Sequence, residues 1–229
     1  MNLIKHIPNV FTLGNLSCGV LAIHFIQKDA YETAVLLVFL AAILDFFDGF
    51  LARMLKADGA LGKELDSLAD LVTFGVAPSF MLYALSYQIH GPERFTFILL
   101  AVFSAYRLAK FNIDTRQSKS FIGVPTPITG IMVMSWAMVK QDALNSLIFD
   151  SSIGYIVFCS VVSLLLVSEI PLPSLKLSKG PIKQYAQHIF LLIVGVISMS
   201  VFGWFCIPIF YTVYVLSSIL INFASKKTP

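Results

Sequence analysis

Long apolar runs, separated by short polar or charged segments, dominate the pattern along this chain. A helix needs about 20 residues to cross the roughly 30 Å hydrocarbon core of a bilayer, and the runs approach or exceed that length. Turn residues and charges mark the breaks between them, as at Gly91-Pro92. The pattern predicts eight membrane-spanning helices, near residues 9–27, 31–53, 64–88, 95–113, 123–140, 153–172, 185–201 and 203–222.

The composition agrees with a membrane protein. Of the 229 residues, 57% are hydrophobic and only 13% are charged, which is unlike an ordinary soluble domain. No internal repeat and no linker long enough to separate domains is visible. We therefore expect residues 1–229 to form a single membrane domain of the all-α class, a polytopic transmembrane helix bundle.

The distribution of basic residues predicts the topology. If the N-terminus is cytoplasmic, all but three of the 16 Lys and Arg residues fall in cytoplasmic segments, and the exceptions are Lys28, Arg94 and Lys140. This is the bias known as the positive-inside rule. With an even number of helices, both termini are expected in the cytoplasm. The net charge of +3 then reflects topology, so no nucleic-acid partner is expected, and the lack of an organelle-targeting segment favours a prokaryotic plasma membrane.

Four aspartates lie inside the second and third apolar runs and form two stripes at helical spacing. One stripe, at i, i+3, i+4, i+7 and i+8, comprises Asp45, Asp48, Gly49, Ala52 and Arg53; the other, at i, i+4 and i+8, comprises Gly62, Asp66 and Asp70. An ionised carboxylate within a membrane costs on the order of 2.5 kcal/mol or more, so it is a functional residue by default. A short loop joins the two helices, and the stripes can face each other near the cytoplasmic side.

The residue types in these stripes indicate metal chemistry. Four adjacent carboxylates repel one another unless a cation lies among them, and oxygen ligands favour Mg²⁺ or Mn²⁺, with Ca²⁺ as a competitor. Four carboxylates can hold two ions about 4 Å apart, which suits in-line displacement at phosphorus. Gly49, Ala52 and Gly62 leave room for a phosphate or ribose, and Arg53 supplies a cation. Carboxylates of an ion-coupled transporter, or acids that cap helices, remain as alternatives.

The motif that contains these residues spans positions 45–70, across the second and third helices. It reads DFFDGFLAR, then eight residues, then GKELDSLAD, and fits D-x-x-D-G-x-x-A-R-(x8)-G-x-x-x-D-x-x-x-D at every position. In this it resembles the signature of the CDP-alcohol phosphotransferase family. The segments at 8–15, 66–78, 107–112 and 121–127 are similar to the membrane-bound phosphatidylserine synthases within that family.

The resemblance implies a reaction and a role for each motif residue. The hydroxyl of L-serine would attack the β-phosphorus of CDP-diacylglycerol, and CMP would leave. Asp45, Asp48 and Asp66 would bind the metal ions, while Asp70 would act as the general base and also touch a metal. The residues expected to line the CDP pocket are Asp45, Asp48, Gly49, Ala52, Arg53, Gly62 and Asp66. The family also suggests a homodimer, and the positive-inside pattern puts the site on the cytoplasmic side.

Recognition of the acceptor is less clearly encoded. The candidates for binding the acceptor or a lipid phosphate are Arg107, Lys110, Asn112, Arg116 and Thr126, and the positive-inside bias explains any single basic residue among them equally well. A family member that uses glycerol 3-phosphate or inositol phosphate is therefore an alternative. An ion-coupled transporter is another, although the inverted repeats and broken helices typical of transporters are not visible.

Overall fold

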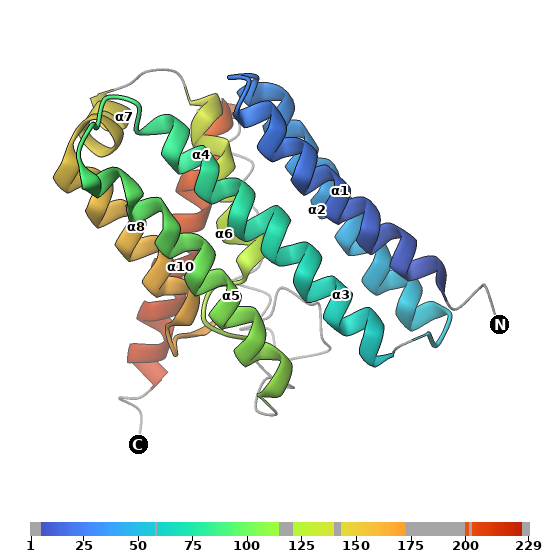
Figure 1. The fold of residues 1–229 in the computed structure, drawn as a ribbon. Coiled ribbons are helices and arrows are strands. Elements are labelled where there is room, and N and C mark those ends of the chain that lie inside the picture. Colours follow the sequence, from blue (N-terminus) through green and yellow to red (C-terminus); the bar gives the residue numbers. More distant parts are fainter. Residues whose placement is uncertain are drawn as a thin grey trace.

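The computed structural model describes residues 6–57, 59–114, 121–139, 143–172, 200–201 and 203–225, which form a helix bundle (Figure 1). Its main helices are α1 (Ile7–Ile26), α2 (Tyr31–Met54), α3 (Ala60–Asp70), α4 (Ala77–Leu85), α5 (Ile98–Ile113), α6 (Thr126–Ser135), α8 (Ser152–Val167) and α10 (Cys206–Ser225). The shorter elements are η2 (Leu71–Val76), η3 (Pro92–Phe97), η5 (Trp136–Met138), α7 (Ala143–Asn145), η6 (Ser146–Asp150) and η7 (Gly203–Phe205).

The all-α prediction is confirmed, and seven of the eight predicted helices correspond to described elements. The helix expected at 185–201 lies outside the described residues except for its last two. Within the part of the chain that the structure describes, five helices are long and apolar enough to cross a membrane: Ile7–Ile26, Tyr31–Met54, Ala60–Leu85, Pro92–Ile113 and Gly203–Leu220. Two further apolar helices, Thr126–Met138 and Ser152–Val167, are shorter. The chain is therefore an integral, multi-pass membrane protein.

Several helix boundaries differ from the prediction, and three of them have a clear local cause. The third helix begins at Ala60 instead of residue 64, because the extended backbone of Gly59 allows the chain to turn directly into it. The fifth begins at Thr126 instead of residue 123, after an extended loop. The sixth ends at Val167 instead of residue 172. Its expected last turn is replaced by β2 (Pro171–Leu172), which pairs antiparallel with β1 (Phe121–Ile122).

Helices α1 and α2 lie side by side, and the continuous helix formed by α3, η2 and α4 crosses beside them (Figure 1). Two other helices approach the backbone of the π-helical segment η2 closely, each at a glycine. A Cβ atom on Gly19 of α1 would lie 2.8 Å from Thr73 Cα, and one on Gly130 of α6 would lie 2.6 Å from the Phe74 carbonyl oxygen. Small residues allow helices to approach this closely in a membrane, so the backbone that follows Asp70 is held firmly.

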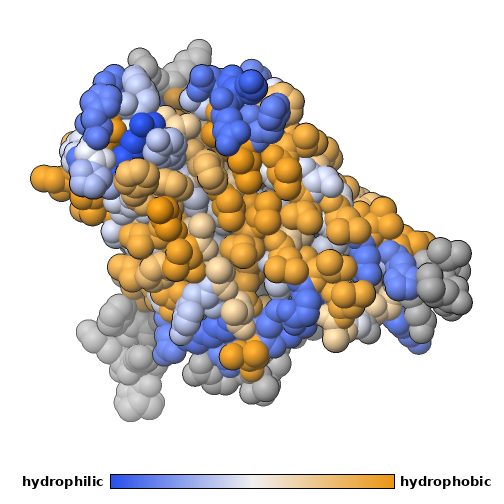
Figure 2. Space-filling model, in the orientation of Figure 1, coloured by the Kyte–Doolittle hydropathy of each residue, from blue (hydrophilic) through white to orange (hydrophobic). Residues whose placement is uncertain are grey.

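The other half of the bundle is formed by α5, α6, α8 and α10. Helix α5 packs on η2 and α8, and α6 packs on η2 and α10. The apolar core of this half of the bundle includes fully buried side chains such as Leu100, Val133 and Tyr155. The face of the molecule seen in Figure 2 has an apolar band between two hydrophilic ends, as expected for a bundle surrounded by lipid. The start of α1, the start of α3 and the ends of α2, α5 and α10 lie toward the same end (Figure 1).

Candidate active site

The structure brings the two aspartate stripes together at the end of the bundle where α2 finishes and α3 begins. One carboxylate oxygen from each of Asp45, Asp48 and Asp66 lies within 4.8 Å of the other two. Their helices are joined by only a few residues, so the stripes on α2 and α3 face each other across a short distance. Three carboxylates this close in a largely buried position repel one another unless they are protonated or a cation lies among them.

Asp70 lies one helical turn beyond Asp66, deeper in the bundle, and its side chain is 8% exposed. The Asp45 carboxyl contacts those of both Asp66 and Asp70. Asp70 is nevertheless not part of the compact set of three oxygens. It instead accepts a hydrogen bond of 3.4 Å from Asn15 Nδ2 of α1. The four aspartates thus form one cluster with a compact group of three and a deeper fourth member.

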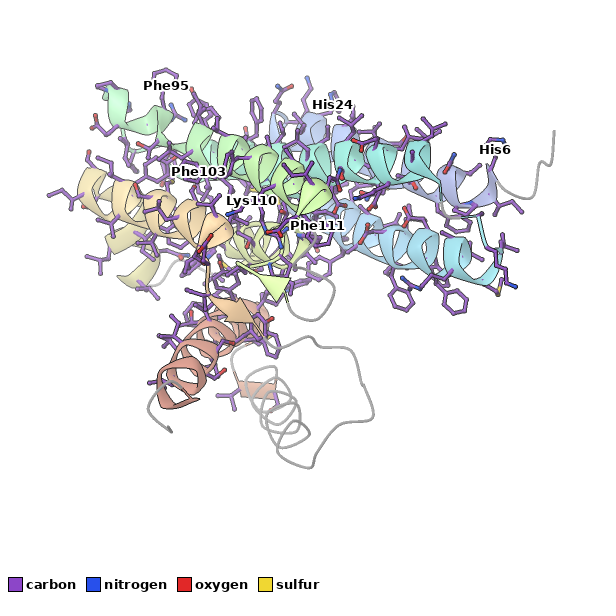
Figure 3. The ribbon with its side chains drawn as sticks, turned by 90° about the horizontal axis from the view of Figure 1, so that it is seen from below. His6, His24, Phe95, Phe103, Lys110 and Phe111 are labelled. Atoms are coloured by element: carbon purple, nitrogen blue, oxygen red, sulfur yellow. The ribbon has the colours of Figure 1, made fainter. Side chains whose placement is uncertain are left out.

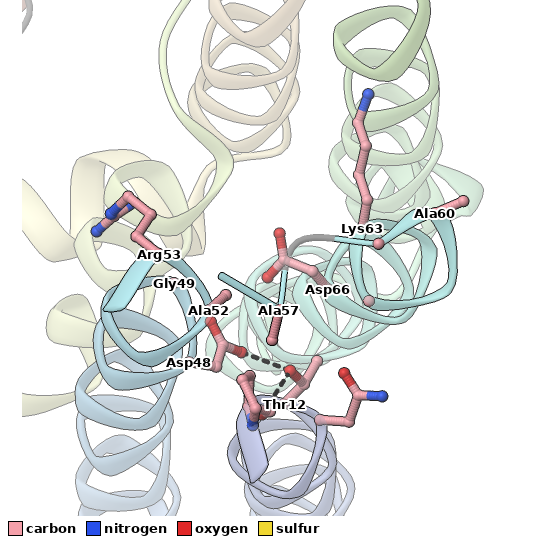
Figure 4. Close-up of a pocket in the computed structure, with 13 residues that line it drawn as sticks. Thr12, Asp48, Gly49, Ala52, Arg53, Ala57, Ala60, Lys63 and Asp66 are labelled. Atoms are coloured by element: carbon pink, nitrogen blue, oxygen red, sulfur yellow. Dashed lines mark hydrogen bonds between the residues drawn. The ribbon is translucent and has the colours of Figure 1, made fainter. Parts of the chain in front are cut away.

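A cavity of about 520 Å³ opens beside the cluster, a size typical of small-molecule sites. Asp48 and Asp66 face each other across it, with Arg53 and Lys63 at its rim (Figure 4). Its lining residues are Pro8, Asn9, Thr12, Asp48, Gly49, Ala52, Arg53, Ala57, Gly59, Ala60, Gly62, Lys63 and Asp66. Of the residues expected to bind CDP, only Asp45 is absent from this wall, because it lies beneath Asp48 on α2.

The two motif glycines border open space. A Cβ atom on Gly49 would meet only Arg53 Nη1, at 3.7 Å, and one on Gly62 would meet only Asn9 Oδ1, at 3.4 Å. Within the described residues, neither glycine is therefore required by close protein packing. Because these glycines lack side chains, the cavity is wider, and we interpret their presence in the motif as making room for a ligand.

The donor set suits a hard divalent cation. The three clustered ligand atoms are all carboxylate oxygens, the type that Mg²⁺, Mn²⁺ and Ca²⁺ prefer. Among the described residues, no histidine belongs to this group of possible ligands. Such a cation would supply the missing counter-charge, so the residues fit a metal site of this class.

Helix α1 contributes two site residues that the aspartate motif alone does not reveal. Thr12 Oγ1 donates a hydrogen bond of 2.7 Å to Asp48 Oδ2 (Figure 4), and Asn15 donates to Asp70 as described. The side chains of Thr12 and Asn15 are almost fully buried. The sequence does carry a signal for them, since Pro8, Thr12 and Asn15 stand at i, i+4 and i+7 on one face of a mostly apolar helix.

The residues expected to bind the acceptor occupy different environments. Arg107 is 8% exposed and donates through Nη1 to Thr126 Oγ1 at 3.2 Å. Lys110, in the last turn of α5 (Figure 3), instead forms an ion pair of 3.4 Å with the exposed Glu169. Asn112 donates to Ser67 Oγ at 2.9 Å and so fastens α5 to α3. Arg116 lies outside the described residues.

The loop before α6 explains how Thr126 reaches Arg107. Gly123 has a φ of +77°, a conformation that other residues rarely adopt. Its amide donates to the Ile170 carbonyl at 3.0 Å, and the Val124 amide donates to the Leu165 carbonyl at 3.2 Å. The loop is thereby held against the end of α8, and this fixes the first turn of α6 beside α5.

Comparison with known proteins assigns this arrangement to a family. The sequence profile described as CDP-alcohol phosphatidyltransferase matches residues 5–172, which include the whole aspartate cluster. A relative from Bacillus subtilis (strain 168), named CDP-diacylglycerol–serine O-phosphatidyltransferase, is 37% identical over 173 residues, which cover 75% of this chain and 92% of the relative.

Two more distant relatives carry related names. One from Helicobacter pylori (strain J99), also named CDP-diacylglycerol–serine O-phosphatidyltransferase, is 35% identical over 183 residues, 78% of this chain and 76% of the relative. An archaetidylserine synthase from Methanothermobacter thermautotrophicus is 28% identical over 169 residues, 73% of this chain and 69% of the relative. The signature motif, the geometry of its aspartates and the length of the match together show that the chain belongs to the CDP-alcohol phosphatidyltransferase family.

Proposed function

We propose that the protein transfers the phosphatidyl group from CDP-diacylglycerol to the hydroxyl of L-serine, giving phosphatidylserine and CMP. The observation that carries this proposal is the compact set of Asp45, Asp48 and Asp66 beside a cavity of about 520 Å³. Membership of the family gives the reaction class, and the names of the relatives from B. subtilis and H. pylori support serine as the acceptor.

Asp45, Asp48 and Asp66 are proposed to hold divalent ions, Mg²⁺ or Mn²⁺, with Asp70 as a further ligand and two ions in total. When bound, such ions neutralise the charge of the pyrophosphate and of the departing CMP. Thr12 orients the Asp48 carboxylate by its hydrogen bond, in the way that outer-shell partners orient metal ligands. Gly49, Ala52, Arg53 and Gly62 are proposed to border the CDP group together with the metal-binding aspartates.

Asp70 is proposed as the general base. The serine hydroxyl oxygen forms a bond to the β-phosphorus, the bond from this phosphorus to the CMP oxygen breaks, and the hydroxyl proton passes to an Asp70 carboxylate oxygen. A positioned base of this kind typically contributes about 10²–10⁴-fold to the rate. A carboxylate held tightly by two cations would be a weak base. The position of Asp70 outside the compact set of three oxygens, with Asn15 as a hydrogen-bond partner, supports this role.

The proposed site faces the cytoplasm of a prokaryotic cell. The basic residues support this orientation, because Arg53, Lys56, Lys63, Arg107 and Lys110 cluster at the end of the bundle that holds the aspartates. Both termini are proposed to lie on the same side. A homodimer is proposed from the family resemblance alone.

The test is release of CMP from CDP-diacylglycerol by the detergent-purified protein. L-Serine, glycerol 3-phosphate and inositol phosphate are compared as acceptors, each with a chelator and with Mg²⁺ or Mn²⁺ restored. We expect metal-dependent release that only L-serine stimulates. Stimulation by a phosphorylated acceptor alone would overturn the choice of serine, and failure of every acceptor would overturn the proposed reaction and favour a transporter.

A further inference from the structure

Arg107 holds a buried charge next to the proposed base. It lies in the membrane-spanning helix Pro92–Ile113, where an ionisable side chain is expected to have a functional partner. Its Nη1 donates to Thr126, while its Nε has no hydrogen-bond partner among the described residues. The guanidinium also interacts electrostatically with Asp70. Arg107 therefore has a free N–H donor, and its guanidinium lies within electrostatic range of the carboxylate that is proposed to contact the acceptor hydroxyl.

The N-terminus of α6 meets Arg107 at the same point. Helix α6 begins at Thr126, and Pro125, in the capping position, supplies no side-chain hydrogen bond. Amide groups in the first turn of a helix have no partner within the helix, and its dipole favours an anion there. The Thr126 hydroxyl accepts from Arg107, so the arginine is directed at this helix end. Two independent features thus prepare the same spot for a negative group.

Helix α10 packs against α6 near Arg107. The Tyr211 hydroxyl lies 3.5 Å from Thr129 Oγ1 on α6, and the buried Tyr214 lies near Arg107. Helix α10 lies beyond residue 172, where the match to the family profile ends. A part of the chain outside the profile match therefore borders the surroundings of Arg107.

Asn15, the hydrogen-bond partner of Asp70 on α1, carries a free acceptor where Arg107 carries a free donor. Its Nδ2 donates to Asp70, and its fully buried Oδ1 has no hydrogen-bond partner among the described residues. The proposed base thus has one neighbour with a free acceptor, Asn15 on α1, and another with a free donor, Arg107 on α5. A zwitterionic amino acid, with an ammonium group and a carboxylate on either side of its hydroxyl-bearing carbon chain, matches both.

We propose that Arg107 and the N-terminus of α6 bind the carboxylate of the amino-acid acceptor and so select L-serine over alcohols that lack a carboxylate. This inference rests on the proposed function. A single guanidinium with a helix end matches one negative charge, whereas a phosphomonoester carries up to two. The nearby Lys110 is already paired with Glu169. The carboxylate is therefore a better match for this site than a phosphate.

The test compares L-serine with ethanolamine, which keeps the hydroxyl and ammonium groups but has no carboxylate. The ratio of kcat/KM for the two acceptors is measured in the wild type and in Arg107→Gln. Loss of one partner from a buried charged hydrogen bond predicts that this ratio falls by about 30-fold or more. The affinity for CDP-diacylglycerol, measured separately by ligand-induced thermal stabilisation, is expected to stay unchanged.

Arg94→Gln is the matched control, because it makes the same substitution in η3, which precedes α5 and lies at the opposite end of the same membrane-spanning helix; there Arg94 lies over the ring of Tyr83. It is expected to leave the acceptor ratio unchanged. Arg107→Lys keeps the charge and allows an intermediate ratio to be measured if Arg107→Gln does not fold. Stabilisation of the wild type by L-serine in the presence of CMP gives a binding readout without turnover, and Arg107→Lys is expected to weaken it.

Three results would overturn the proposal. The first is an acceptor ratio that stays unchanged in both Arg107 variants. The second is an acceptor ratio that falls in Lys110→Gln and not in the Arg107 variants. The third is a loss of affinity for CDP-diacylglycerol in the Arg107 variants with an unchanged acceptor ratio. The last result would assign Arg107 to a lipid phosphate. Absence of serine-dependent CMP release in the wild type would instead reject the proposed function itself, so the two failures are distinguishable.

Discussion

The hydrogen bond between Thr12 and Asp48 gives the sharpest test of the metal site. The substitution Thr12→Val keeps the shape of the side chain and removes its hydroxyl. The Oγ1–Oδ2 distance is 2.7 Å, and both residues are at least nine-tenths buried. A hydrogen bond to a charged group contributes about 1.5–3 kcal/mol, which corresponds to roughly 10- to 150-fold in an equilibrium constant. Removal of an outer-shell partner typically weakens metal affinity by about 10–100-fold.

We therefore expect Thr12→Val to weaken Mn²⁺ binding by at least about tenfold. Binding is followed by the loss of the free Mn²⁺ signal in electron paramagnetic resonance, and the Mn²⁺ dependence of CMP release is measured in parallel. Thr12→Ser, which keeps the hydroxyl, should bind Mn²⁺ nearly as well as the wild type. Thr96→Val makes the same change in η3, where the hydroxyl donates to the Glu93 carbonyl, and should have no effect. A Mn²⁺ affinity of Thr12→Val within about twofold of the wild type would refute the reasoning.

Three further substitutions test the base, its partner and the loop before α6. Asp70→Asn should abolish turnover while CDP-diacylglycerol still binds in a thermal-shift assay; near-native turnover would reject Asp70 as the base. Asn15→Leu removes a 3.4 Å hydrogen bond to Asp70 and should lower kcat/KM for serine by about tenfold, whereas an unchanged value would show that Asn15 does not position the base. Gly123→Ala adds strain at a φ of +77° and a Cβ atom 2.6 Å from the Leu166 carbonyl oxygen, so its apparent Tm should fall by several degrees. Gly203→Ala has a φ of +55° with open space around it and should lower Tm less; equal losses would rule out the close contact as the cause.

The motif could be read from the sequence because its chemistry lies along single helices. Asp45 and Asp48 share a face of α2, and Asp66 and Asp70 share a face of α3, through the 3.6-residue period alone. The loop between these helices is short, so the two faces had few ways to lie other than toward each other. The length of the apolar runs similarly predicted where the described membrane helices lie. The predicted helix ends were wrong at Ala60, Thr126 and Val167, where a turn, an extended loop or the β1–β2 pair competes with the helix.

The contacts between distant helices could not be read in the same way. Apolar faces look alike in lipid, so sequence periodicity does not tell which helix packs against which. Lys110 and Arg107 stand one turn apart and had equal weight as acceptor candidates, yet Lys110 pairs with Glu169 and Arg107 is buried against Thr126. Their difference arises from the docking of α6 and α8 against α5.

The sequence by itself thus determined the class of the protein, its membrane helices and the carboxylates that define its chemistry, because charge in an apolar segment and helical spacing are local properties. Tertiary structure alone decided that Thr12 and Asn15 of α1 support those carboxylates, and that Tyr214 of α10 stands beside Arg107. These partners are separated by tens of residues and meet through the packing of distant helices, which includes the close contacts of Gly19 and Gly130 with η2.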